Sequence, residues 1–130
     1  MFNRYTKGAI ENSKLAKIYY PGWILRVYYS NISNEVKDAL IRQGAEIIQV
    51  KEMNMFSRFM VAGDPAVDRF IVRDSDSRLN SRERFAVQEW IESNKSLHSI
   101  RDHVKHCYSF NGGMWGGLKG LNTLNIIYYF

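Results

Sequence analysis

The sequence predicts an α/β fold with a mainly parallel sheet flanked by helices, in a single domain over residues 1–130. β-branched and aromatic runs alternate along the chain with segments of helical periodicity, which is the pattern of strands joined by covering helices. Aromatic residues make up 14% of the chain, so one domain of this length can bury a modest core. No internal repeat, linker or low-complexity segment divides it.

The first half of the chain is expected to hold two helices and two strands. In order these are a helix over Tyr5–Tyr20, a strand over Ile24–Tyr29, a helix capped by Ser33 and ended by Gly44, and a strand over Ala45–Val50. Pro21 cannot continue the first helix, and glycine is the usual residue just past a helix end. The segment from Met53 to Ala62 is ambiguous, although its apolar residues have helical spacing.

The second half continues the alternation. The apolar run Phe70–Val72 predicts a buried strand, and Leu97–Ile100 a short one. Between them Asn80 is a good N-cap with Glu83 three residues later, so a helix is expected from Ser81 to about Glu92. A glycine-rich stretch and an apolar tail follow.

The stretch Arg73-Asp74-Ser75-Asp76-Ser77-Arg78-Leu79 joins the predicted buried strand to that helix. Ligands of open α/β sheets bind where strands end and helices begin. A turn there aims Asp74 and Asp76 at one point, and the flanking Arg73 and Arg78 favour their ionised forms. Hard oxygen ligands of this kind suit Mg²⁺ or Mn²⁺. The alternative is an ordinary polar turn with surface ion pairs.

Charge and cysteine content narrow the function classes. The formal charge is +5 and is scattered, which suits an anionic ligand such as a nucleotide diphosphate; without a basic stripe or known motif, nucleic acid is not an expected partner. Cys107 is the only cysteine, so a reducing, cytoplasmic compartment is predicted. The chain shows no signal peptide, and no apolar run approaches the ~20 residues of a membrane span.

Several motifs, taken in their order along the chain, resemble those of a known protein family. They include Tyr20-Pro21-Gly22-Trp23, the arginine–aspartate turn just described, Arg101-Asp102-His103 and Gly112-Gly113-Met114-Trp115-Gly116. In this order they resemble glycosyltransferase-like proteins of the GT-A type, found in bacteria and large viruses. The resemblance covers about residues 5–117, and leaves 118–130 as a divergent tail.

The resemblance implies a nucleotide-sugar donor, a divalent metal and transfer of the sugar to an acceptor hydroxyl on a carbohydrate or glycan. Asp76 and Asp74 would hold the Mn²⁺ or Mg²⁺ that neutralises the leaving diphosphate. Asp74 would also contact the ribose, and Arg73 and Arg78 complete the expected substrate-binding turn. For a viral member of such a family the compartment would be the host cytoplasm.

Four further groups of residues are candidates with an open alternative. Asp102 and His103 could line the sugar pocket as acid–base or orienting groups, or form a structural ion pair and an exposed side chain. His106 could be a third metal ligand or a surface residue. The stretch containing Gly112, Gly113, Met114 and Trp115 could wall the sugar site, or be a loop with Trp115 in the core. Tyr5 and Lys7 could contact base and phosphates, or simply begin an amphipathic helix.

The chain also departs from the GT-A pattern. Such a domain normally opens with a strand that carries part of the nucleotide site, and the resemblance here begins after that point and stops at Gly117. The alternative function is therefore a non-catalytic, truncated remnant that binds nucleotide or a partner protein; a weaker one is a metal-dependent phosphohydrolase. The apolar residues Ile126 to Phe130 are expected to pack onto the open sheet or to contact another chain by self-association.

Overall fold

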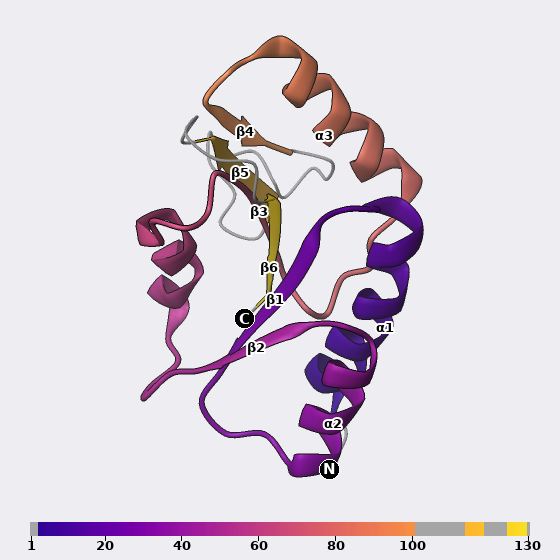
Figure 1. Cartoon of the computed structure of the whole chain (residues 1–130), viewed down its shortest axis with the longest axis vertical. Coiled ribbons are helices and arrows are strands. Elements are labelled where there is room, and N and C mark those ends of the chain that lie inside the picture. The colour runs from indigo at the N-terminus through magenta and orange to yellow at the C-terminus, as the bar shows by residue number, and fades with distance from the viewer. Residues whose placement is uncertain (1–2, 101–113, 119–124, 130) are drawn as a thin grey trace.

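A computed structural model describes residues 3–100, 114–118 and 125–129, which form one sheet covered by helices on both faces (Figure 1). The helices are α1 (Arg4–Tyr19), α2 (Asn34–Arg42), the 3₁₀ helix η1 (Met55–Gly63) and α3 (Ser81–Ser93). The strands are β1 (Ile24–Tyr29), β2 (Glu46–Gln49), β3 (Arg69–Arg73), β4 (Leu97–Ser99), β5 (Met114–Leu118) and β6 (Asn125–Tyr129). The predicted α/β class is confirmed.

The six strands lie in the order β2-β1-β6-β3-β5-β4. Strands β2, β1, β6 and β3 pair in parallel, whereas β5 is antiparallel to both β3 and β4. The sheet is therefore mixed, and the expected parallel arrangement holds only for the first four of these strands. No strand was predicted in or after the glycine-rich stretch, but residues 114–118 form the antiparallel strand β5.

The apolar tail contributes a central strand. β6 lies between β1 and β3, with Ile126 opposite both Ile24 and Phe70, and Ile127 is fully buried. Packing of the tail onto the sheet was expected at an open edge, but both edges of β6 are paired inside this chain. The segment that diverges from the resemblance thus completes the middle of the sheet.

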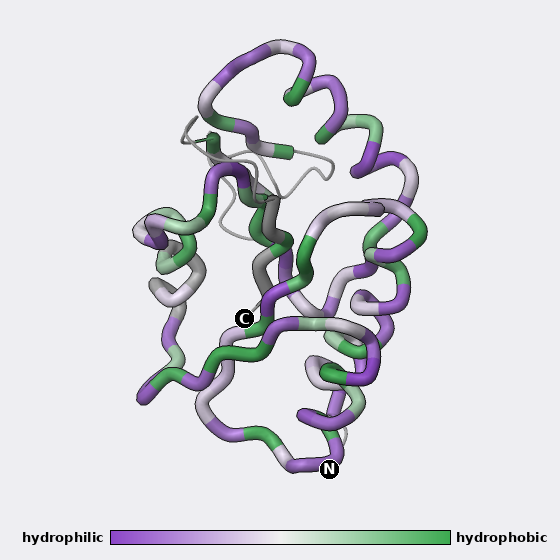
Figure 2. Tube along the Cα trace, viewed as in Figure 1, coloured by the Kyte–Doolittle hydropathy of each residue, from purple (hydrophilic) through white to green (hydrophobic). Residues whose placement is uncertain are grey.

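Alternation along the strands produces one apolar cluster on each face. Helices α1, α2 and α3 cover one face and η1 lies on the other (Figure 1), and hydrophobic residues run along the strands between them (Figure 2). On the helical face Leu25, Val27 and Ile71 pack with side chains of the three helices. On the η1 face Phe70 and Trp115 meet edge to face, with ring centroids 5.0 Å apart.

Glycines in β5 permit close packing on both faces of the sheet, since Gly116 faces Ile71 and Trp90 of the helical-face cluster and Gly117 faces Phe70. A Cβ on Gly116 would lie 2.6 Å from the carbonyl oxygen of Phe70, and one on Gly117 would lie 2.8 Å from the Phe70 ring. These glycines make room for the neighbouring strand and its aromatic side chain, and not for a ligand.

Candidate functional site

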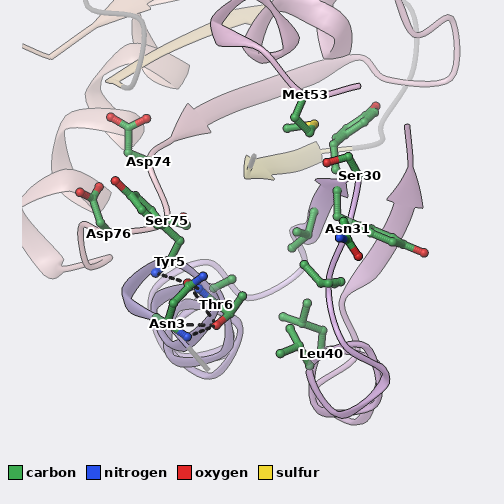
Figure 3. A pocket seen from close by; sticks show the side chains of 16 residues that line it. Asn3, Tyr5, Thr6, Ser30, Asn31, Leu40, Met53, Asp74, Ser75 and Asp76 are labelled. Atoms are coloured by element: carbon green, nitrogen blue, oxygen red, sulfur yellow. Dashed lines mark hydrogen bonds between the residues drawn. The ribbon is translucent and has the colours of Figure 1, made fainter. Parts of the chain in front are cut away.

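A pocket of about 660 Å³ lies at the carboxyl ends of β1 and β3 (Figure 3). One side is formed by the turn after β3 and the first turn of α1; the other is formed by the segment after β1 and by α2. The lining residues named in Figure 3 are Asn3, Tyr5, Thr6, Ser30, Asn31, Leu40, Met53, Asp74, Ser75 and Asp76. Its volume is in the range of small-molecule sites.

The aspartate turn is a compact, internally bonded piece of backbone. The backbone N–H of Ser77 donates to the carbonyl oxygen of Asp74 at 3.2 Å, and the Ser77 hydroxyl donates to the same oxygen at 2.9 Å. Ser75, between the two aspartates, is buried while Asp76 is exposed. Both aspartates are among the lining residues, so the turn forms one rim of the pocket.

Helix α1 packs against this turn and holds it in place. Asn12 is fully buried; its Nδ2 donates to the Ser77 carbonyl at 2.8 Å, and its Oδ1 accepts from the Leu79 N–H at 3.1 Å. One turn earlier, Gly8 leaves the Ser75 backbone room to approach the helix axis. The bond from the Leu79 N–H satisfies a buried backbone donor, and the bond to the Ser77 carbonyl ties the turn to α1.

The arginines that flank the turn have structural roles. Arg73 is 1% exposed, and its Nε lies 2.7 Å from Oε1 of the buried Glu83 on α3. The expectation that Arg73 contacts substrate is therefore wrong, because its guanidinium is in the core. Arg78 is exposed, but its Nη1 donates to the carbonyl oxygens of Ser75 (3.4 Å) and Ser77 (3.2 Å), and so braces the turn.

Asp76 is held by a basic residue that the sequence did not single out. Nη2 of Arg4, in the first turn of α1, lies 2.9 Å from Oδ2 of Asp76. Within the described part of the chain, no group of three or more His, Cys, Asp or Glu side chains is placed to hold a metal. A cation at this rim would have two protein carboxylates and take its other ligands from water and a bound anion, a set that Mg²⁺ and Mn²⁺ accept.

Two helix N-termini border the pocket. Asn3 caps α1 by accepting from the N–H groups of Tyr5 and Thr6, and Ser33 caps α2 by accepting from Val36. The positive end of a helix dipole favours anions. The far wall is apolar, with Val27, Ile32, Val36, Leu40 and Met53 among the lining residues. The pocket thus combines an anion-attracting rim with an apolar interior.

The remaining expected site residues separate into three groups. Tyr5 lines the pocket, while Lys7 is exposed and is not among the lining residues. Met114 and Trp115 do not line it either: Trp115 is 5% exposed in the η1-side cluster, so the core alternative is correct for this residue. Asp102, His103, His106, Gly112 and Gly113 lie outside the described residues.

Sequence reasoning missed Ser30 and Asn31. The strand Ile24–Tyr29 was predicted correctly, and these two polar residues follow its end. The same rule that singled out Asp74, namely polar residues at the carboxyl end of a buried strand, could have found them. No sequence pattern pointed to Asn12, because the backbone groups that it bonds are more than 60 residues away along the chain.

Comparisons with family models, with curated proteins and with solved structures gave no match. Among the described residues, no helix combines the length and apolar character needed to cross a bilayer.

Proposed function

We propose that this chain is a metal-dependent glycosyltransferase that binds a nucleotide-sugar in the pocket at the ends of β1 and β3. The observation that carries the proposal is that Asp74 and Asp76 share one rim of a pocket large enough for such a ligand. The pocket also lies where ligands of parallel α/β sheets bind.

The polarity of the pocket fits a nucleoside diphosphate. The two helix N-termini and the exposed Arg4 attract phosphates, and the apolar wall accepts a base or sugar face. When bound, Mn²⁺ or Mg²⁺ would neutralise the charge that develops on the leaving diphosphate. Asp74 and Asp76 would hold that cation. The hydrogen bonds of Asn12 and the close contact at Gly8 keep the turn that carries them in place.

Calorimetric titration tests this function. UDP, GDP and a panel of nucleotide-sugars are titrated with and without Mn²⁺, and Mn²⁺ is expected to strengthen binding of at least one of them. Asp76→Ala should abolish this effect of the metal, whereas Asp38→Ala, which removes an exposed carboxylate of α2, should preserve it. An Asp76→Ala variant that binds Mn²⁺ and nucleotide as the parent does would place the site elsewhere.

Incubation with radiolabelled nucleotide-sugars, Mn²⁺ and an acceptor library separates the alternatives. Transfer of sugar to an acceptor supports the glycosyltransferase. Donor binding without transfer supports a non-catalytic nucleotide-binding domain, and release of free phosphate supports a phosphohydrolase.

A further inference from the structure

The ion pair between Arg4 and Asp76 joins the two segments that form one side of the pocket mouth. It links the first turn of α1 to the aspartate turn, at 2.9 Å between Nη2 and Oδ2. Both side chains reach solvent, with 69% of Arg4 and 34% of Asp76 exposed. Exposed pairs of this kind contribute little to stability, so their partners exchange readily.

The position of Arg4 is unfavourable for a cation without a counter-charge. It lies at the positive end of the α1 dipole, and the first turn of α1 contains no acidic residue. Its neighbours are Asp76 and Tyr5, whose hydroxyl accepts from Nη2 at 3.0 Å and whose ring centroid lies 4.9 Å from the guanidinium carbon. The counter-charge is thus supplied by a carboxylate of the proposed metal site.

A divalent cation bound to Asp76 would compete with Arg4 for the same oxygen and repel its guanidinium. Arginine that loses a carboxylate partner is well suited to bind phosphate, because its planar fork donates two parallel N–H bonds. The side chain is long and exposed, and its helix borders the pocket, so a diphosphate held at the aspartate rim lies within the region it can sample.

We propose that Arg4 exchanges between two partners: it neutralises Asp76 when no cation is bound, and binds the diphosphate when a cation takes Asp76. This inference rests on the proposed metal-dependent function and adds a ligand-coupling role for Arg4. Cation and nucleotide then bind with positive coupling, since the cation both bridges to the diphosphate and releases a second group that binds it.

The test compares Arg4→Gln with Lys14→Gln. Lys14 is a matched control, because it is an exposed base on the same helix and pairs with Glu11 at 3.4 Å. Mn²⁺ affinity is measured by electron paramagnetic resonance without nucleotide, and UDP or GDP affinity by calorimetry with and without Mn²⁺, with the Mn²⁺–nucleotide complex in solution accounted for. Circular dichroism checks that both variants fold.

Arg4→Gln is expected to bind Mn²⁺ alone about two- to fivefold more tightly, because the competing ion pair is gone. It should bind nucleotide in the presence of Mn²⁺ about tenfold more weakly, so the coupling between the two ligands shrinks. Lys14→Gln should match the parent in both measurements. A merely structural role for Arg4 would not change the two affinities in opposite directions.

Unchanged or weaker Mn²⁺ binding by Arg4→Gln, or an unchanged coupling, overturns this inference while the proposed function stands. If the parent protein binds no Mn²⁺, or binds it independently of Asp76, the proposed function fails and the role of Arg4 fails with it.

Discussion

Gly8 of α1 lies against the backbone of Ser75 with no room for a side chain, since a Cβ at position 8 would be 1.8 Å from the Ser75 carbonyl oxygen. An alanine at a helical glycine usually stabilises a protein. Gly8→Ala should instead lower the free energy of unfolding by about 1–3 kcal/mol, because the turn must move away from the helix. Gly63→Ala is the control, since nothing lies within 4 Å of a Cβ there. Equal melting temperatures for Gly8→Ala and the parent would contradict this contact.

Asn12→Ala should also loosen the aspartate turn. It removes two hydrogen bonds, and the loss costs about 1–3 kcal/mol because the buried Leu79 N–H is left without its side-chain partner. Ser13→Ala is the control, because the buried Ser13 hydroxyl donates only to a carbonyl of its own helix. Denaturant titration measures the free energy of unfolding. A larger loss of stability for Ser13→Ala than for Asn12→Ala would contradict the role of Asn12 in holding the turn.

The buried ion pair of Arg73 and Glu83 anchors α3 to β3. Glu83→Gln should destabilise the fold by about 3–5 kcal/mol, because it leaves the guanidinium buried without its counter-charge. The double replacement of Arg73→Met with Glu83→Leu should cost less than the single change. Glu89→Gln, at an exposed position of the same helix, should have little effect. Chemical denaturation of the four proteins checks this order.

Trp115→Ala distinguishes a core residue from a pocket wall. The buried indole packs against Phe70, so its removal should cost about 3–5 kcal/mol of stability and leave ligand affinity unchanged. Thermal melting and nucleotide titration are the two measurements. A small change in melting temperature with a large loss of affinity would reverse the assignment.

His98 should make stability depend on pH. Its ring stacks on Trp90 at 5.0 Å, and burial, aided by the charge of Arg73, lowers its pKa from 6.5 to about 4. Below its ordinary pKa the unfolded chain binds a proton that the folded chain does not, so the free energy of unfolding falls as the pH drops from about 7 towards 4. His98→Phe should keep the stacking and flatten this dependence, as thermal melts from pH 7.5 to 5 would show. Parallel curves for the two proteins would contradict the low pKa.

Local patterns predicted most of the elements but not the sheet they form. The caps at Ser33 and Asn80 and the strand Ile24–Tyr29 follow from the identity and spacing of neighbouring residues, and the structure has all three. The position of β6 between β1 and β3 depends on contacts between distant segments, and a short apolar tail carries no sign of its partners. In the site, the aspartates were visible as a motif, whereas Arg4 and Asn12 became relevant only once α1 was placed against the turn.

The central position of β6 constrains the order in which the strands of the sheet can pair. β6 is the last of the described elements to be synthesised, yet it separates β1 from β3 in the finished sheet. Until those residues emerge, both neighbours present an unpaired, largely apolar edge, and the contacts that close it span long stretches of chain. Before β6 is synthesised the centre of the sheet is therefore incomplete, and this is the stage at which we expect chaperones to be most needed.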